Sequence, residues 1–551
     1  MDYAACLDYL REMVFRMELA DEKFRKLAYE RALHALSSQG TLDGFQDLAG
    51  IGSSIRQELE TLVSGAWPEK IVRLRQDGPP VSVLELTRLR GVGSRMALIL
   101  HRSGVSSIDQ LAAAVKGGTI QDPKMISAYY NYVASGDRMP WCEADAVMTR
   151  LLPMLQAVAG VVSVLGVGSY RRRRADVRSL DVLVVVSSIG VVARVVAALP
   201  GAQQVGPDTA KLDFVFGTEK RPVVFSFCLT RGAALATLHL TGSKAFNASV
   251  RARAQEMHGV SLIDIQAKGG QDFADEADVF SWLRLPFIPP ELRDHYTDFS
   301  TPLSADLVLP ADIIGDLHTH TSNSDGRCSV AEMLVAAKGR GYKCVGVSDH
   351  SRGAGKGLKP ESVLSYASEL QAQDVGLRVL VGLELDVRIT RELDCPASYL
   401  GHLDYVILAT HAEPDRDVLA RLAAGVDAVR AVYPRMPLVF AHPSNRLLGE
   451  RRPADIDWKS FFHLCAAKNV AIEINGQGRR LDLDDSHVRV GSQYKCRFLC
   501  SSDAHSTEQL SNMDNAVVAA RRGLLERSSV INTSVSRLQG WLDGRDLRKM
   551  R

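Results

Sequence analysis

The chain has 551 residues, more than one hydrophobic core can organise, so we expect several domains. Its net charge of +2 excludes nucleic-acid binding through bulk charge, so any such binding must come from local basic patches. The composition, with 46% hydrophobic and 24% charged residues and no unbroken apolar run of spanning length, excludes a membrane-embedded protein. The 9 cysteines form no CxxC pair, and we expect reduced thiols in a cytoplasmic protein.

The first 140 or so residues have helical periodicity and contain two similar Gly-containing turns. LAGIGSSI (48–55) and LRGVGSRM (89–96) each precede an amphipathic segment and resemble helix-hairpin-helix motifs. A GxG turn presents backbone N–H groups to a DNA phosphate, because a side chain would block its approach. An ordinary loop is the alternative for either turn taken alone. The candidate DNA contacts are Gly50, Gly52, Gly91, Gly93 and Arg95, with Arg56 and Arg102 as further candidates that a solvated helix face would also explain.

Strand-like runs follow between 145 and 230, and the segment GSYRRRRADVRSLDVLVVV (168–186) is the most informative of them. A Gly-Ser turn with several arginines indicates phosphate or DNA binding, with a solvated charged loop as the alternative. The apolar strand carries Asp181 and, two residues earlier, Ser179. Residues two apart share one face of a strand, and a two-metal nucleotidyl-transfer site needs a carboxylate pair there. Asp176, at an odd offset, faces the other way, so the segment contains half of such a site.

Beyond residue 230 the pattern is helical around LTGSKAFNASVRARAQE, and residues 285–310 form a Pro-rich linker. From 311 to 551, seven short apolar runs alternate with helical stretches. Such alternation predicts a parallel sheet, either open or closed into a barrel. In a barrel the chemistry lies at the carboxyl ends of the strands.

Side chains of metal-ligand type follow these apolar runs. They are His318, His320, Asp325, His350, Glu384, His411, His442, Asp503 and His505. Imidazoles with carboxylates suit Zn²⁺, Mn²⁺ or Fe²⁺, and this set is too large for one ion. We therefore expect two or three divalent ions that generate hydroxide and clamp a phosphate. An ordinary core or loop role explains any one of these residues alone, but not all of them at strand ends.

The motifs around these residues resemble the PHP family of phosphoesterases. HTHTSNSDG, SDHS, GLELD, THAEP, AHPSNRLLGE, IEINGQGRRLDLDD and SSDAHS occur in the family's order. The resemblance implies a (β/α)7 barrel that hydrolyses phosphate esters with Mn²⁺ or Zn²⁺ held by the ligand set above. Arg352 and Arg446 lie beside ligand positions and are candidates for binding the substrate phosphate, with a solvated surface role as the alternative. Asp349 is a candidate to orient its neighbours.

The order of the parts resembles family X DNA polymerases joined to a PHP domain. It implies a multidomain α+β and α/β fold with a nucleotidyltransferase-like palm. The expected domains are a helical lyase-like domain at 1–80, fingers at 81–144, a palm at 145–230, a thumb at 231–284, a linker at 285–310 and a PHP domain at 311–551. Lyase chemistry needs a lysine near the first turn, for which Lys70 is a weak candidate.

Two family motifs that hold the nucleotide occur here as GSYRR and HLTGSKAFN. The nucleotide-binding residues that they imply are Gly168, Ser169, Arg172, Gly242, Ser243, Asn247 and Arg251. His239 and Leu240 replace the aromatic pair that lines the nucleotide sugar, and Arg173 replaces a glycine in a turn that needs backbone freedom.

The metal site of the polymerase departs from the family pattern. Ser179 replaces the first carboxylate and leaves Asp181 as a vestigial ligand, while Val224 replaces the third carboxylate and Ser226 the arginine after it. Two Mg²⁺ ions would lack ligands there, so we expect no stable Mg²⁺ pair and polymerisation that is absent or very weak. The alternative is that Asp213, Asp208 or water completes the site.

The favoured hypothesis is a monomeric DNA-repair enzyme, a metal-dependent 3′–5′ exonuclease with the PHP domain as its working part. Abasic-site cleavage and removal of 3′ phosphates are related possibilities. The N-terminal half would bind gapped, nicked or 3′-ended DNA, with weak dNTP binding and no membrane contact. One alternative is an active gap-filling polymerase with a proofreading exonuclease. Another is a small-phosphoester phosphatase fused to a DNA-binding module.

Overall fold

The computed structural model divides the chain into two compact units. One consists of Met1–Gly136, Phe214–Arg221 and Gly449–Arg451, and the other of Asp137–Asp213, Pro222–Leu448 and Arg452–Arg551. The described residues are 3–39, 42, 44–89, 92–122, 125–126, 129, 138–199, 203–206, 209–216, 219–260, 272–351, 357–411 and 417–544. Of these, the backbone alone is described at 3–4, 34, 37–39, 88, 116 and in the strands between 203 and 222. Among these, no helix is long and apolar enough to cross a membrane, and all nine cysteines are free.

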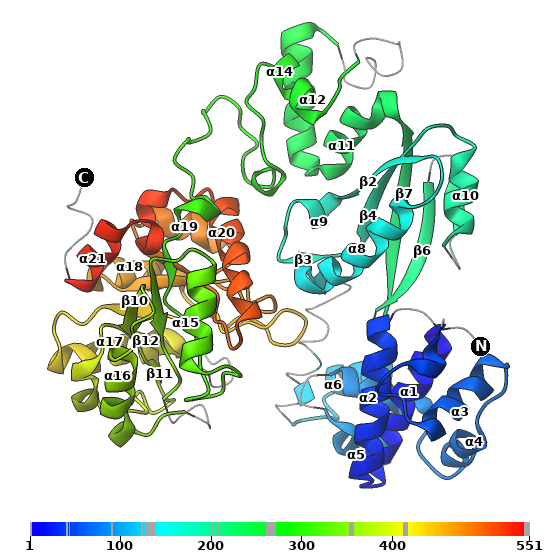
Figure 1. Ribbon diagram of the computed structural model, residues 1–551, viewed down its shortest axis with the longest axis horizontal. Helices are drawn as coiled ribbons and strands as arrows, with labels where there is room; N and C mark the ends of the chain where they lie inside the picture. Colours follow the sequence, from blue (N-terminus) through cyan, green and yellow to red (C-terminus); the bar gives the residue numbers. More distant parts are fainter. Residues whose placement is uncertain are drawn as a thin grey trace. The chain divides into compact units, whose positions relative to one another are not determined.

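The N-terminal part of the first unit is helical (Figure 1). Its elements are α1 (Tyr3–Leu19), α2 (Lys23–Gln39), η1 (Phe45–Asp47), α3 (Ser53–Val63), α4 (Glu69–Gln76), η2 (Val81–Arg88), α5 (Ser94–Arg102) and α6 (Ile108–Lys116). One apolar core joins α1 to α4 through residues such as Leu10 and Leu59, and a second, containing Leu86 and Ala97, holds η2, α5 and α6. The described part of this unit therefore has two small cores, one including Ile51 of the first GxG segment and the other including Val92 of the second.

Residues 138–229 contain a five-stranded sheet with helices packed on it. The strands run in the order β2 (Val161–Val167), β4 (Leu180–Val186), β7 (Glu219–Leu229), β6 (Thr209–Phe216) and β5 (Gln203–Gly206), accompanied by β1 (Met139–Pro140), β3 (Asp176–Val177), α8 (Trp141–Gln156), α9 (Gly168–Arg171) and α10 (Val191–Ala197). Strand β4 is central, antiparallel to β2 and parallel to β7. It is buried on both faces at every residue except Asp181, which explains its nearly continuous apolar sequence.

A small helical layer follows the sheet. It consists of η3 (Thr230–Gly232), α11 (Ala233–Thr241), α12 (Lys244–His258), α14 (Glu276–Trp282) and η4 (Pro290–Leu292). Its core contains Phe246 and Phe280, together with Ile288 and Leu292 from the segment predicted as a linker. Arg293 is fully buried, and its guanidinium is 2.6 Å from Glu276 Oε1, so the first part of that segment packs as part of this layer.

The C-terminal domain alternates strands and helices, with helices such as α15 to α18 lying around the strands in Figure 1. Its elements are η5 (Pro310–Asp312), β8 (Gly315–Asp316), α15 (Val330–Gly339), β9 (Cys344–Val347), η7 (Pro360–Ser362), α16 (Val363–Gln371), β10 (Arg378–Val381), β11 (Glu384–Asp386), η8 (Ala397–His402), β12 (Val406–Ala409), α17 (Val418–Val432), β13 (Leu438–Phe440), α18 (Trp458–Lys468), β14 (Ala471–Asn475), α19 (Asp485–Gln493), β15 (Arg497–Ser501), η9 (Glu508–Asn512), α20 (Met513–Arg522), η10 (Arg527–Ser529), η11 (Ile531–Thr533) and α21 (Val535–Leu542).

All strand pairs of this domain are parallel, in the orders β10-β9-β8 and β11-β12-β13-β14-β15. Two isolated parallel bridges join the two sheets just beyond the ends of β9 and β8, His350 with Glu384 and Thr319 with Ala504. This pairing is compatible with a closed ring of parallel strands. It also brings the carboxyl ends of the strands to one side, where the candidate ligands lie.

The strands of this domain are packed on both faces. Outward residues such as Val406, Leu408 and Phe440 pack against the helices, while inward residues such as Ile407 and Val439 form a separate inner core. Tyr405 fills this inner core, and its hydroxyl donates a 2.6 Å hydrogen bond to the Leu317 carbonyl. Gly346 and Gly382 flank the Tyr405 ring, and a Cβ at either position would overlap it. These glycines therefore leave the space that the tyrosine occupies.

Replacing Gly346 with alanine should overpack this inner core and lower the free energy of unfolding of the domain by about 1–3 kcal/mol. The measurement is the thermal midpoint of the full chain by calorimetry. Gly339→Ala is the matched control, because Gly339 is at the exposed end of α15 with no atom within 4 Å of an added Cβ. Equal midpoints for the two variants would contradict this packing.

Candidate metal centre

The nine side chains predicted as metal ligands lie together at the carboxyl ends of the parallel strands. Glu384, at the start of β11, is 1% exposed and occupies the middle of the group. Its Oε2 is 3.4 Å from His318 Nε2, 3.6 Å from His320 Nε2 and 2.8 Å from His350 Nδ1. Its Oε1 is 3.4 Å from His411 Nε2 and 3.1 Å from His442 Nε2. One carboxylate thus contacts five imidazoles.

The two aspartates and His505 complete the cluster on either side of Glu384. Asp503 Oδ1 is 3.2 Å from His320 Nε2 and 3.6 Å from His318 Nε2. Asp325 Oδ1 is 3.3 Å from His505 Nε2 and 3.7 Å from His350 Nε2. The candidate ligand atoms form three overlapping groups: His320, Asp325, His350 and His505; His318, His320 and Glu384; and His350, Glu384 and His411. Within each group the atoms are close enough for one ion to contact all of them.

The hydrogen bonding of the histidines fits divalent cations. His318 Nε2 and both ring nitrogens of His320 are fully buried and have no hydrogen-bond partner among the described residues. Buried polar atoms are normally paired, because an unpaired one loses its hydration without compensation. Imidazole nitrogens that face carboxylates are also the donor set that Zn²⁺ and Mn²⁺ take in proteins. The residues present therefore fit a metal cluster.

Three of the histidines are held in the charged form by nearby carboxylates. Burial opposes protonation of His318, but Glu473, Asp503 and Glu384 outweigh it and hold the pKa of His318 well above its usual value. Burial likewise opposes protonation of His411 and His505, yet neighbouring carboxylates raise the pKa of each to about 9. Without metal these imidazoles retain protons that compensate the buried negative charge.

Two other buried histidines have lowered pKa values. Burial, together with the charges of His350, His505 and His318, lowers the pKa of His320 to about 3. Burial and the nearby Arg480 guanidinium lower the pKa of His442 to about 4. Neutral imidazoles, ready to bind a cation, thus stand beside charged ones in the same cluster.

Glu473 on β14 supports the cluster, although the sequence analysis did not single it out. Its carboxylate is fully buried and lies 2.5 Å from His318 Nδ1. It also accepts hydrogen bonds from the His442 backbone N–H at 2.6 Å and the Ser501 hydroxyl at 2.5 Å. A carboxylate on the far nitrogen of a histidine fixes the ring and its tautomer, and so directs Nε2 at a metal. The signal was the motif AIEIN, in which polar residues alternate along a buried strand.

Other carboxylates hold the loops around the cluster. Asp349, predicted to orient its neighbours, accepts hydrogen bonds from the Thr321 hydroxyl at 2.7 Å and the Ser324 hydroxyl at 2.5 Å. Asp386, which the sequence analysis missed, accepts from the backbone N–H of His411 at 2.9 Å. These contacts position the backbone that carries the candidate ligands.

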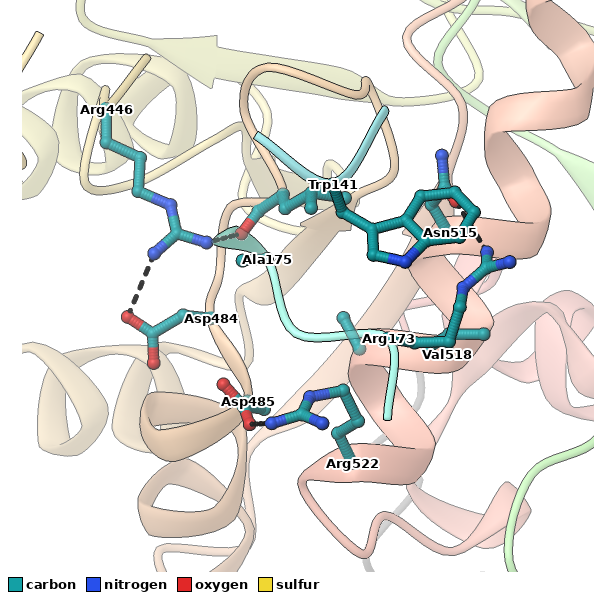
Figure 2. Close-up of a pocket in the computed structure, with 11 residues that line it drawn as sticks. Trp141, Arg173, Ala175, Arg446, Asp484, Asp485, Asn515, Val518 and Arg522 are labelled. Atoms are coloured by element: carbon teal, nitrogen blue, oxygen red, sulfur yellow. Dashed lines mark hydrogen bonds and ion pairs between the residues drawn. The ribbon is translucent and has the colours of Figure 1, made fainter. Parts of the chain in front are cut away.

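The two arginines predicted to bind phosphate are not both described. Arg352 lies outside the described residues. Arg446 donates to the carbonyls of Arg480, at 2.8 Å, and Leu481, and its guanidinium is 3.4 Å from Asp484 (Figure 2). A phosphate role for Arg446 remains a prediction.

Among the described side chains, the predicted polymerase site has one carboxylate at the centre of its sheet. Asp181 on β4 is paired in register with Val167 on β2 and Val224 on β7. The hydroxyl of Ser179 is 3.3 Å from both carboxylate oxygens of Asp181. Gly168 has a φ of 63°, and a Cβ there would lie 2.5 Å from Asp181 Oδ2. Valines therefore flank Asp181 on both neighbouring strands, and Val224 is at the position predicted for the third carboxylate, while the Asp213 side chain and Asp208 lie outside the described parts.

Comparison with known proteins places these features in a family. Residues 236–294 match the model of the DNA polymerase beta thumb, and residues 316–477 match that of the PHP domain. The DNA polymerase/3′-5′ exonuclease PolX of Bacillus subtilis is 27% identical over 555 residues, which cover 95% of this chain and 96% of that protein. The chain belongs to the bacterial family X polymerases that carry a PHP domain.

Relatives of the separate halves agree with this membership. A probable phosphatase of Vibrio parahaemolyticus is 27% identical over 246 residues, covering 42% of this chain and 94% of that protein. DNA polymerase lambda of Rattus norvegicus is 24% identical over 314 residues, covering 50% of this chain and 53% of that protein.

The structure of this family X chain brings some of the predicted nucleotide-binding residues together. Arg172 NH1 donates to the Thr241 carbonyl at 2.5 Å, next to Gly242, where φ is 69°. Ser243 caps α12, and Asn247 Nδ2 donates to the His239 carbonyl at 2.7 Å. Ser169 is half-buried on α9 and Arg251 is exposed on α12. Nucleotide binding by these residues remains a prediction.

The arginine run of the predicted palm contacts the PHP domain. Arg173 has a φ of 55°, a conformation that favours glycine, and its guanidinium is 3.6 Å from the Trp141 ring centroid. It also donates to Asn515 Oδ1 on α20 at 2.8 Å (Figure 2). Arg522 on α20 donates to the Arg172 carbonyl at 2.5 Å. The arginines that the sequence suggests for phosphate binding thus also hold the palm against the PHP domain.

A charged network extends this contact. Asp294 lies between Arg172 Nε at 3.0 Å and Arg522 NH2 at 3.1 Å. Asp485 on α19 is 2.6 Å from Arg522 NH2 and 2.9 Å from His295 Nε2. The pKa values of both aspartates are lowered, since these cations outweigh the effect of burial.

The two GxG turns each lead directly into a helix. Gly52 is the N-cap of α3 and Gly93 the N-cap of α5, and neither helix start has a side-chain cap. Gly50 has a φ of 96°, while Gly91 lies outside the described residues. Arg95 is 76% exposed and 3.2 Å from Asp21. DNA binding at these positions remains a prediction.

Lys70, the weak lyase candidate, has close polar neighbours. Its Nζ donates to the Tyr29 hydroxyl at 2.7 Å and lies 3.7 Å from Glu58 Oε1. No nucleophilic role follows from these contacts.

Replacing Glu473 with glutamine should weaken metal binding about 10–100-fold, because the amide no longer holds His318 with a buried charge. The measurement is the Mn²⁺ dissociation constant of the full chain by isothermal titration. Glu369→Gln, at an exposed position on α16, is the control. Unchanged affinity in the Glu473 variant would show that this carboxylate serves only the fold.

Metal affinity should rise with pH. His411 and His505 have pKa values of about 9 without metal, and an imidazole must lose its proton to bind an ion. The apparent Mn²⁺ dissociation constant should therefore fall by up to about tenfold per pH unit for each displaced proton, and level off above about pH 9. Chelator competition between about pH 6 and about pH 10 measures this, and a flat profile would contradict it.

Proposed function

We propose that the chain is a DNA-repair enzyme that degrades DNA from 3′ ends with the metal cluster of its PHP domain. The observation that carries the proposal is an asymmetry between the two candidate sites. Eight ligand-type side chains converge around Glu384, the ninth, whereas Asp181 has only valines beside it in register. A site that transfers nucleotides with two ions needs several carboxylates, and a hydrolytic cluster needs the ligands that are present.

The residues of the cluster have distinct tasks in this proposal. Glu384 belongs to two of the three ligand groups and would help to hold the ions of both. Asp325 and His505 hold one side, and His318 with Asp503 the other. Two or three Mn²⁺ or Zn²⁺ ions would supply a hydroxide at neutral pH and neutralise charge on the phosphate. The chain itself binds and orients the ions, and Glu473 keeps His318 in the required tautomer.

The N-terminal half would bring DNA to the cluster. The starts of α3 and α5 follow GxG turns, and backbone N–H groups at a helix start bind phosphate without reading sequence. We propose gapped, nicked or 3′-ended DNA as the partner of a cytoplasmic monomer. In this proposal the helical N-terminal part corresponds to the helix-hairpin-helix and fingers domains of the family, the five-stranded sheet to the palm and the small helical layer to the thumb. The parallel strands of the C-terminal domain correspond to a (β/α)7 barrel.

Polymerisation is proposed to be absent or very weak. Ser179 lacks the charge of a carboxylate, and Val224 has no ligand atom beside Asp181. The name of the Bacillus subtilis relative favours the alternative, a polymerase that also has a proofreading exonuclease. The relatives described as probable phosphatases favour another, a small-phosphoester phosphatase joined to a DNA-binding module.

The chain should release mononucleotides from labelled 3′ ends in the presence of Mn²⁺, and His320→Ala should reduce the rate by more than about 100-fold because it removes a shared ligand. His402→Ala, at an exposed position outside the cluster, is the control. Primer extension with Mn²⁺ and Mg²⁺ should give no templated product.

Three results would contradict the proposed function. Robust templated extension would support the polymerase alternative. Turnover of a small phosphoester without release of nucleotides would support the phosphatase alternative. Full nuclease activity of His320→Ala would place the active site elsewhere.

A further inference from the structure

Arg480 lies at the edge of the metal cluster, in the turn that follows β14. Its side chain is 12% exposed, and its Nε is 3.5 Å from Asp503 Oδ2. Its NH1 is 3.5 Å from Asn445 Oδ1, in the loop that begins with His442. The guanidinium therefore stands between two strand-end loops, each of which carries a candidate metal ligand.

The guanidinium of Arg480 has few good hydrogen bonds for a group so deeply placed. It offers five N–H donors, yet its one hydrogen bond among the described residues is the 3.5 Å contact to Asn445. Its Nε is buried and donates no hydrogen bond. Burying a guanidinium without hydrogen-bond partners costs free energy. A residue in this position is therefore expected to bind an anionic ligand that supplies the missing partners.

Neighbouring arginines in the same domain are satisfied by the protein. Arg446 donates to two backbone carbonyls and pairs with Asp484. Arg522 pairs with two aspartates and donates to a carbonyl. Each of these arginines thus has short hydrogen bonds to backbone carbonyls and a carboxylate partner, whereas Arg480 has one hydrogen bond of 3.5 Å among the described residues.

Asp503 does not depend on Arg480 for its position. Its Oδ2 accepts a 3.0 Å hydrogen bond from Asn475 Nδ2, and its Oδ1 faces His320 and His318. The Arg480 contact to Asp503 is longer than a normal hydrogen bond. The donors of Arg480 are thus left for a ligand in the cluster.

We propose that Arg480 binds the phosphoryl group of the substrate beside the metal ions. A guanidinium binds two phosphoryl oxygens at once, and it stabilises negative charge that a carboxylate-rich cluster would otherwise repel. This proposal rests on the proposed hydrolytic function of the cluster. The same chemistry serves a phosphodiester at a DNA 3′ end or the phosphate of a small ester.

The test measures binding of inorganic phosphate to the Mn²⁺-loaded full chain by isothermal titration, so that it does not depend on which substrate is turned over. Arg480→Gln should weaken phosphate binding by about 10–100-fold with the Mn²⁺ content unchanged, and Arg480→Lys should recover part of it. Arg479→Gln is the matched control, since this adjacent arginine is 47% exposed and pairs with Glu143.

A second arm titrates a dinucleotide with a 3′ end. Weaker binding of both probes to Arg480→Gln supports a contact with any phosphoryl group, and weaker binding of the dinucleotide alone supports a contact with DNA phosphate. Unchanged binding of both, or loss of Mn²⁺ from the variant, would overturn the proposal, the latter by showing that Arg480 acts through Asp503. Failure of the wild-type chain to release nucleotides would instead count against the proposed exonuclease.

Discussion

The organisation of the C-terminal domain depends on concentrated charge inside a fold that excludes water. Five imidazoles surround the Glu384 carboxylate, and Asp503 and Asp325 close the two sides. So many polar groups are costly to bury unless cations or protons balance them. The raised pKa values of His411 and His505 show protons in that role, and divalent ions would take it over. The inner core below, filled by Tyr405, gives the cluster a rigid base.

Asp181 is the one acidic residue among the described side chains of the five-stranded sheet in the N-terminal half. Strand β4 is buried on both faces and pairs in continuous register with β2 and β7. Burial raises the pKa of Asp181, and the Ser179 hydrogen bond and the Arg172 charge offset this rise only in part. A lone carboxylate of this kind is a poor site for two Mg²⁺ ions. Val224, at the position predicted for the third carboxylate, is an apolar residue of β7 paired in register with Asp181.

The arginine run that precedes Asp181 in the sequence contacts the PHP domain. Arg172 shares Asp294 with Arg522, and Arg173 reaches Asn515 from a backbone conformation that normally favours glycine. Buried arginines paired with aspartates impose a geometry, because breaking one partner leaves an uncompensated charge. A motif associated with nucleotide phosphates thus also serves to join two parts of the chain.

The sequence by itself determined the candidate ligands and the gap in the polymerase site. Histidines and aspartates after apolar runs must meet where parallel strands end, and residues two apart on a strand share a face. The contacts of Glu473 with His318 and of Arg480 with Asp503 could not be predicted in this way, because each depends on which strand-end loop the side chain meets in the folded domain. The same holds for the contact of Arg173 with Asn515, 342 residues further along the chain. Strand position is a local property of sequence, whereas the pairing of charges is decided by packing between distant segments.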